Sequence, residues 1–188
     1  MRKHFLLLLL PILLCGCAAP REDPGLQLRS TVLEKGCSFD AEITADYGNS
    51  LSVFTVSCQA DPEGAVTFTV TAPEGISGIS GTLAAGSGKL HFADKALSFP
   101  LLADGLLAPV SAPWIFVRTL RAGNLIASGK EGELTRLSID DSFRDDALRL
   151  DIWLNREDTP VRADILSRGQ KYLSLSLTNF RTESDSDA

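Results

Sequence analysis

From residue 37 onward, hydrophobic and polar residues alternate with a period of two. The clearest run, Val66 to Ala72, places a threonine between each pair of apolar residues, and similar runs surround Tyr47–Ser50 and cover Leu148–Leu154. An antiparallel strand with one buried face and one solvent face produces this pattern. Such runs predict about ten strands, at the spacing typical of an all-β sheet or barrel.

Two cysteines lie in the strands that flank the first predicted turn. A hairpin centred between Tyr47 and Gly48 places Cys37 opposite Cys58 and keeps the apolar residues on one face. That arrangement suits a disulfide, and two buried free thiols fit the same pattern. Both interpretations stay open at this point.

The period of two is interrupted between residues 100 and 124. Ser111 is placed to cap a helix that begins at Ala112, and Gly123 with Asn124 is placed to end it. A stripe of Pro113, Phe116, Val117 and Leu120 runs along this helix, while Trp114 and Ile115 lie well off the stripe.

A helix that is apolar on more than one side must be covered on more than one side. The simplest cover is a strongly curved sheet. The pattern therefore predicts a mainly β (α+β) fold, in which a strongly curved antiparallel sheet or half-barrel of about ten strands is closed by a helical insertion.

The first sixteen residues have the architecture of a bacterial lipoprotein signal peptide. Two cations precede a short apolar run, and Leu14-Cys15-Gly16-Cys17 resembles a lipobox, which predicts lipidation of Cys17. Cleavage before Cys15, plain secretion and an uncleaved anchor are the alternatives. The apolar run is shorter than the ~20 residues that a transmembrane helix needs. We therefore expect an extracytoplasmic protein, anchored to the cell membrane by acyl chains on its N-terminal cysteine.

The rest of the chain is predicted to form one domain between two irregular segments. Pro20, Pro24 and Gly25 argue for a flexible tether over residues 17–30, although a short helix or edge strand from Leu26 to Leu33 is an alternative. Residues 31–180 are expected to form the domain, and the polar, acidic residues 181–188 to be disordered.

Charge excludes one class of partner. The chain has a formal charge of −6 at pH 7, and removal of Arg2 and Lys3 with the signal peptide would leave −8. A basic surface for nucleic acid is therefore not expected. We expect a monomer whose membrane contact is its lipid anchor.

The sequence has little that predicts catalysis. His91 alternates with Leu90 and Phe92, which places it on the solvent face of a strand, and no zinc-ligand spacing or nucleophile elbow is present. The run Asp140–Asp146 lacks the glycine and terminal glutamate of an EF-hand loop, and Arg144 neutralises part of it. We predict no enzyme activity, no catalytic residue, no metal site and no cofactor.

The two tryptophans allow two interpretations. Trp153 is out of phase with the apolar residues of its strand, so it is expected to be exposed or to pack under the C-terminal tail. Trp114, which lies off the main stripe of the helix, is expected either to pack in a closed core or to line a cavity for an acyl chain.

A lipobox, an alternating sheet and one apolar helix together resemble the superfamily of bacterial lipoprotein-localisation factors, the LolA/LolB/RseB-like domains. The resemblance rests on Phe68–Val70 with Ala72-Pro73-Glu74, on the stretch from Phe99 to Pro109, and on Leu173–Phe180. It implies a curved half-barrel whose concave face holds acyl chains or contacts lipoproteins. The sequence departs from the family in having no clear long N-terminal helix.

We therefore expect a lipid-anchored protein that binds a hydrophobic ligand, either a lipid or the acyl part of a lipoprotein, in the concavity of its sheet. The alternative is an envelope protein-interaction or sensor module with a packed, ligand-free core and an exposed surface around Trp153. The candidate ligand-binding residues are Phe54, Val56, Phe68, Val70, Phe92, Trp114, Ile115 and Leu120.

Overall fold

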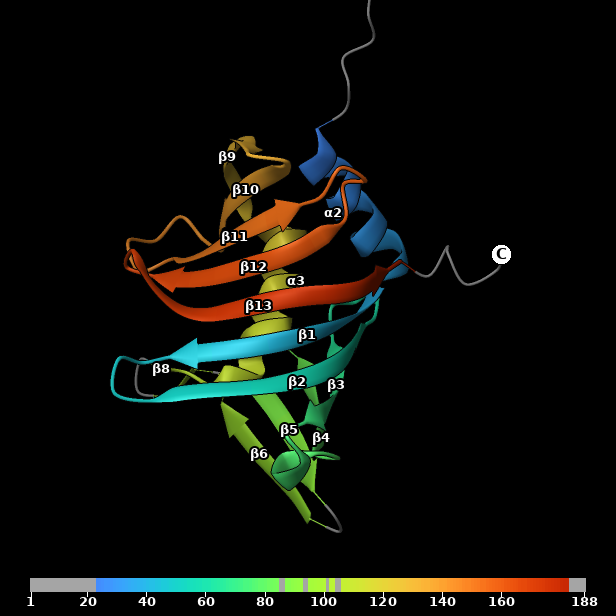
Figure 1. Cartoon of the computed structure of the whole chain (residues 1–188), viewed down its shortest axis with the longest axis vertical. Helices are drawn as coiled ribbons and strands as arrows, with labels where there is room; N and C mark the ends of the chain where they lie inside the picture. Colours follow the sequence, from blue (N-terminus) through green and yellow to red (C-terminus); the bar gives the residue numbers. More distant parts are fainter. Residues whose placement is uncertain (1–22, 85–86, 93–94, 101, 104–105, 183–188) are drawn as a thin grey trace, which may run out of the picture.

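Eleven antiparallel strands form one curved, open sheet that wraps around helix α3 (Figure 1). The computed structural model describes residues 23–84, 87–92, 95–100, 102–103 and 106–182; the predicted signal peptide, Cys17 and residues 183–188 lie outside the described residues. The fold class predicted from the pattern is confirmed. The strands, in sheet order, are β6 (Lys95–Pro100), β5 (Ser87–Phe92), β4 (Ser80–Ala84), β3 (Val66–Ala72), β2 (Leu51–Ala60), β1 (Cys37–Asp46), β13 (Gln170–Arg181), β12 (Pro160–Ser167), β11 (Leu148–Leu154), β10 (Leu134–Asp140) and β9 (Asn124–Glu131).

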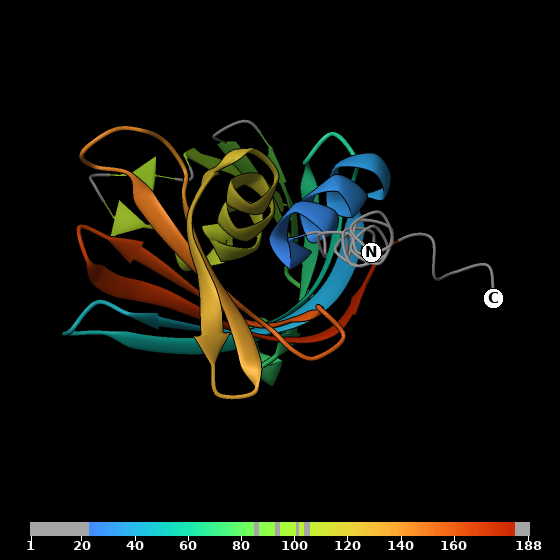
Figure 2. The same cartoon turned by 90° about the horizontal axis from the view of Figure 1, so that it is seen from above.

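The sheet consists of two meanders joined at its middle. Strand β1 pairs with β2 on one side and with β13 on the other, so Ile43 has Phe54 and Leu175 as its cross-strand neighbours. The connection between the two meanders contains a small two-stranded sheet, β7 (Leu102–Ala103) and β8 (Leu106–Leu107), followed by α3. Seen from above, the sheet forms a trough that holds α3 (Figure 2).

The register of the first hairpin differs from the prediction by two residues. Cys37 lies opposite Ala60, and Cys58 lies opposite Phe39. The loop comprises all four residues Tyr47–Ser50, closed by a 3.0 Å hydrogen bond from the Tyr47 amide to the Ser50 carbonyl. The two cysteines are therefore not directly opposed, and both are buried free thiols.

Helix α3 (Ala112–Ala122) begins and ends where the sequence predicts, after one turn of 3₁₀ helix at Pro109–Ser111. Every residue of α3 except Arg118, Arg121 and Ala122 is buried. The predicted side-chain cap is wrong, because the Ser111 hydroxyl donates a 2.6 Å hydrogen bond to the Ala108 carbonyl and caps no amide of α3.

An N-terminal helix, α2 (Pro24–Lys35), occupies part of the predicted tether. The Asp23 carboxylate accepts a 2.8 Å hydrogen bond from the Gly25 amide, and Pro24 stands at the first helical position, where its missing N–H costs nothing. Leu28 and Val32 are buried in the core. The tether prediction is therefore wrong from Pro24 onward, and the open alternative of a short helix there is the one observed. No helix within the described residues is long and apolar enough to span a membrane.

The core lies between the concave face of the sheet and the two helices. Three phenylalanines connect the sheet to α3 within the core. The rings of Phe39 on β1 and Phe116 on α3 meet edge to face, with 5.4 Å between their centroids, and the Phe180 ring on β13 stacks on Phe39 with a centroid distance of 6.1 Å. Aromatic pairs at such separations stabilise a core beyond their buried area. They fix α3 at the seam between β1 and β13.

Candidate functional site

The concave face of the sheet is filled by the protein's own helix. Seven of the eight residues predicted to bind a ligand are between 0 and 8% exposed and belong to one continuous core, which α3 completes. They come from strands β2 and β3 and from α3 itself: Phe54, Val56, Phe68, Val70, Trp114, Ile115 and Leu120. The structure thus brings these residues together, but as packing partners.

Phe92 is the exception. It was expected to face the interior with the other seven, yet its side chain is 56% exposed. Leu90, two residues earlier on the same face of β5, packs against the core, and its cross-strand partner Leu97 on β6 is 63% exposed. Alternation places all three side chains on the concave side.

These three residues, Leu90, Phe92 and Leu97, form what we call the β5–β6 patch. The patch continues the apolar concave face toward the β6 edge, beyond the part of the sheet that is buried under α3. An exposed apolar surface continuous with a core is a common feature of binding sites. The alternation along β5 correctly predicted that the Phe92 side chain faces the concave side of the sheet. It could not predict that the buried core ends before Phe92.

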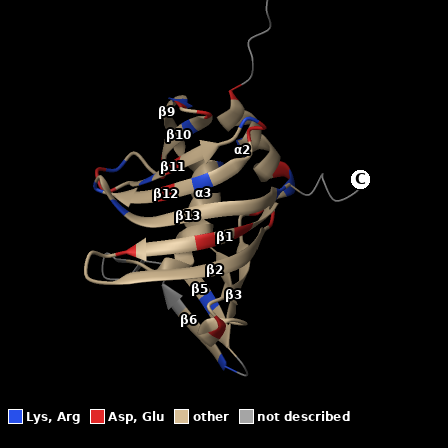
Figure 3. Ribbon diagram, viewed as in Figure 1, with Lys and Arg blue, Asp and Glu red and all other residues tan. Residues whose placement is uncertain are grey.

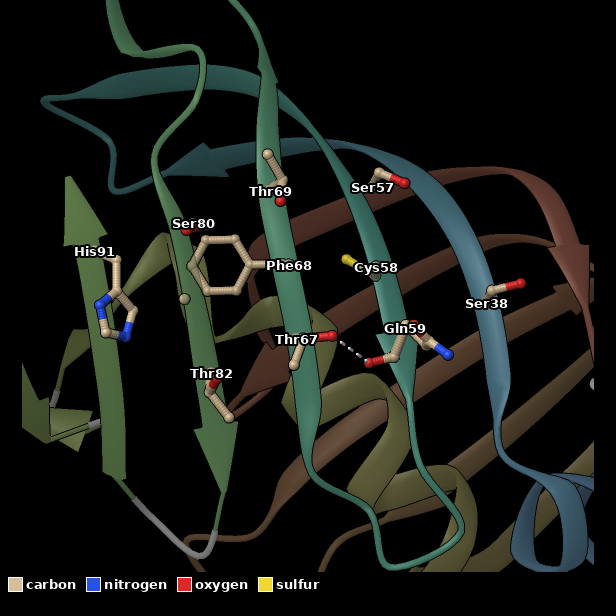
Figure 4. A pocket seen from close by; sticks show the side chains of 11 residues that line it. Ser38, Ser57, Cys58, Gln59, Thr67, Phe68, Thr69, Ser80, Thr82 and His91 are labelled. Carbon is tan, nitrogen blue, oxygen red and sulfur yellow. Dashed lines mark hydrogen bonds between the residues drawn. The ribbon is translucent and has the colours of Figure 1, made fainter. Parts of the chain in front are cut away.

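A second hollow lies on the opposite, outer face of strands β1–β5 (Figure 4). It has a volume of about 450 Å³, and its floor includes Cys58, Phe68 and Gly81. Uncharged polar side chains and one histidine surround it. We call this set the outer groove: Ser38, Ser57, Gln59, Thr67, Thr69, Ser80, Thr82 and His91.

The strand register places the outer groove in two rows that cross the sheet. One row runs Ser38, Gln59, Thr67, Thr82, and the other runs Ser57, Thr69, Ser80, His91. Alternation along each strand keeps these side chains on the outer face while their neighbours fill the core. Periodicity alone assigns these residues to the solvent side of strands, and the repeated threonines of β3 are the sequence signal for a polar surface there.

A cluster of charged residues surrounds Trp153 on the outer face of β9–β12. The Trp153 ring lies between the guanidinium groups of Arg136 and Arg162, 5.4 and 4.2 Å from its centre, and its Nε1–H donates a 3.1 Å hydrogen bond to Glu131. Trp153 is only 6% exposed. The predicted polar side of its strand is correct, but the expected exposure is wrong, because two arginines cover the ring.

Two carboxylates beneath this cluster are also buried. Asp151 accepts hydrogen bonds from Arg136 (2.5 Å) and from the Ser138 hydroxyl (2.6 Å), while Asp164, its cross-strand partner, accepts one from Arg162 (2.5 Å). The hydrogen bond to Asp164 raises the pKa of the Arg162 guanidinium above its ordinary value. Each carboxylate is thus paired with its own arginine.

The acidic run Asp140–Asp146 extends from the end of β10 into the connection to β11. Arg144 neutralises part of it, as predicted, and two further arginines also pair with it. Arg149 donates to Asp140 at 2.9 Å, Arg144 to Asp146 at 2.9 Å, and Arg118 lies 3.5 Å from Asp141. Phe143, at the tip of this connection, is 92% exposed. Among the described residues, no group of three or more acidic, histidine or cysteine side chains is arranged to hold a metal ion.

The two cysteines are unsuited to nucleophilic chemistry. Burial raises the pKa of the Cys37 thiol from 9.0 to about 12, against a smaller lowering by Arg121. Burial also raises the pKa of Cys58, and the nearby Cys37 and Asp40 add to this effect. Neutral, buried thiols of this kind behave as small hydrophobic groups.

Comparisons with known proteins find likeness in fold only. No protein-family model matches the chain, and no curated protein matches it. Among solved structures, a LolA superfamily protein from Nitrosomonas europaea aligns over 84% of this chain and 93% of its own, with 8% identity and a TM-score of 0.45. A putative outer membrane lipoprotein-sorting protein domain from Vibrio parahaemolyticus aligns over 85% and 91%, with 11% identity and a TM-score of 0.44. The lipoprotein LppX from Mycobacterium tuberculosis aligns over 83% and 92%, with 11% identity and a TM-score of 0.41.

Proposed function

We propose that this chain is a lipid-anchored extracytoplasmic protein that binds a hydrophobic ligand, the acyl chain of a lipid or of a lipoprotein, on the concave side of its sheet. Anchoring rests on the lipobox-like residues that end at Cys17. Binding is proposed to begin at the β5–β6 patch. No catalytic group takes part in such a function.

One observation carries the proposal. On the concave side, Phe92 and Leu97 are 56% and 63% exposed beside a continuous apolar core. Covering apolar surface releases roughly 25 cal/mol for each Å² removed from water, so an acyl chain laid on this patch gains free energy without any polar contact. An acyl chain can also extend the core from Leu90 outward, because Leu90 already packs against it.

The test compares two pairs of matched variants in a chain that begins at Ala18 and so keeps every described element. Binding of palmitate and of a palmitoyl lysophospholipid is measured by calorimetry in the absence of detergent. Phe92→Ser and Leu97→Ser are each expected to weaken binding about tenfold, which corresponds to roughly 1.4 kcal/mol.

The controls are Phe143→Ser and Leu51→Ser, which remove apolar side chains elsewhere that are more exposed than Phe92 and Leu97, at 92% and 67%. They are expected to leave binding unchanged. Absence of binding by the parent chain, or equal losses in all four variants, would refute the proposed site.

A second candidate function is a protein-interaction module with a closed core. It is favoured by the packing of α3, whose Phe116, Val117 and Leu120 are fully buried in the concavity. The surface around Trp153 that this alternative required is exposed but charged, because Arg136, Arg162 and Glu131 cover the Trp153 ring. Native mass spectrometry separates the two functions, since a co-purifying lipid supports the first, whereas a ligand-free mass that persists after incubation with lipids supports the second.

A further inference from the structure

We infer that the outer groove is a second binding site, and that its ligand is a neutral oligosaccharide. The site lies on the opposite face of the sheet from the β5–β6 patch and is independent of acyl-chain binding. Its hollow of about 450 Å³ falls within the range of roughly 300–1,000 Å³ that is usual for small-molecule sites.

The first argument is the supply of hydrogen-bonding groups. A hydroxyl group can donate and accept, and a primary amide carries both functions, so Ser, Thr and Gln side chains complement the hydroxyl groups of a sugar. Within the described part of the chain, Thr67 is the one residue of the outer groove whose side chain makes an intramolecular hydrogen bond, 3.3 Å to the Gln59 carbonyl. The other seven side chains are therefore available to a ligand (Figure 4).

The second argument is charge. Strands β2, β3 and β4, which supply most of the outer groove, contain no Asp, Glu, Lys or Arg, and β2 and β3 carry no charge colour along their length (Figure 3). The whole chain has a formal charge of −6. Asp40 beside Ser57 and Lys89 beside Thr82 flank the outer groove on the same face, and their charges are opposite in sign. The eight side chains of the outer groove themselves include no Asp, Glu, Lys or Arg, so the groove favours a ligand that is polar but uncharged.

The third argument is the spacing of the two rows. Cross-strand neighbours in a sheet lie about 4.8 Å apart, so Gln59, Thr67 and Thr82 present polar groups at a regular interval across three strands. That interval is comparable to the length of one pyranose unit in an extended oligosaccharide. The regular rows thus fit a chain of sugars lying across the strands better than a single small molecule.

The test uses nitrogen-15 amide shifts of the chain that begins at Ala18, titrated with maltotriose and with triacetylchitotriose. We expect saturable shifts confined to β1–β5 for at least one of the two sugars. Thr69→Val and Thr82→Val, which come one from each row and keep the side-chain shape, are together expected to weaken binding at least about tenfold. Thr178→Val removes an exposed hydroxyl of β13 outside the outer groove and is expected to have no effect.

Three results would overturn the inference: no saturable shift with either sugar, shifts that lie outside β1–β5, or equal affinity in the double valine variant and the parent. A trimer of galacturonic acid serves as the charged probe. Binding of this anionic trimer as tight as that of the neutral sugars would also contradict the charge argument. The valine variants replace exposed threonines in strands, so their amide spectra are expected to show an unchanged fold.

Discussion

The guanidinium group of Arg29 on α2 donates a 2.7 Å hydrogen bond to the carbonyl oxygen of Leu120 near the end of α3. A second bond of 2.7 Å reaches the carbonyl of Gly123, the residue that ends α3. A cation at this end of a helix also interacts favourably with the helix dipole. The N-terminal helix is thus held to the helix that fills the trough.

Replacing Arg29 is expected to loosen this attachment. Arg29→Ala removes two charge-assisted hydrogen bonds and should lower the free energy of unfolding by about 1.5–3 kcal/mol in urea titrations. Gln27→Ala, on an exposed face of the same helix, should change it by less than about 0.5 kcal/mol. Equal effects of the two variants would show that the Arg29 bonds contribute nothing to stability.

The buried carboxylate of Asp151 provides a second prediction. Asp151→Ala leaves Arg136 without its buried partner and Ser138 without its acceptor, so we expect a loss of roughly 2–3 kcal/mol of unfolding free energy. Asp146→Ala breaks a fully exposed pair with Arg144 and should leave the urea midpoint unchanged. A small effect at Asp151 would contradict the role assigned to its burial.

Gly81 on β4 has no room for a side chain between atoms of its two neighbouring strands, β3 and β5. A Cβ atom there would lie 2.6 Å from the Lys89 carbonyl oxygen and 2.8 Å from the Phe68 ring. Gly81→Ala is therefore expected to destabilise the fold by about 1–3 kcal/mol, measured by thermal unfolding. A Cβ atom at Gly129 on β9 would meet no atom within 4 Å, so Gly129→Ala should be neutral or slightly stabilising. Similar melting temperatures for the two variants would show that β4 can shift to accept a side chain at residue 81.

The two thiols predict how stability changes at high pH. The pKa of Cys37 is raised from 9.0 to about 12, so the unfolded state loses this proton first as pH rises. The stability from the protonated thiol is complete below about pH 8 and is lost as pH increases toward 12. Urea titrations from pH 7 to 11 should show a smaller decline in a Cys37→Ala/Cys58→Ala variant than in the parent, and an equal decline would refute this contribution.

The same burial predicts slow chemical modification. Iodoacetamide should label neither Cys37 nor Cys58 in the folded protein at pH 8, and should label both of these residues after unfolding in urea. Thiols that are buried and protonated react only when the structure opens. Rapid native labelling, or a Cys37–Cys58 disulfide found by mass spectrometry, would contradict the free, buried thiols described above.

Periodicity predicted the strands well because it reports which face each residue occupies. It could not fix the register of the first hairpin. A slip of two residues leaves every side chain on its own face, so the pairing of Cys37 with Cys58 and the observed pairing with Ala60 satisfy the pattern equally. The four-residue loop decided between them.

The sites were harder to predict because exposure depends on distant elements. Phe92 has the phase of a core residue, yet it lies beyond the edge of the core and stays 56% exposed. Trp153 has the phase of a surface residue, yet arginines from β10 and β12 bury it. Near the N-terminus, Asp23 followed by Pro24 is a helix-start signal, although proline and glycine in the same stretch also predict an irregular segment.

The pairing of β1 with β13 makes the formation of the single sheet depend on the C-terminal residues. The last described strand, β13, pairs with the first, β1, so the two meanders join into one sheet only when residues 170–181 are present. A chain that stops before residue 170 would keep two separate meanders, with β1 and β12 as new unpaired edges of alternating apolar residues. Because such edges pair readily with other chains, a late nonsense mutation is expected to yield an aggregating product rather than a shortened domain.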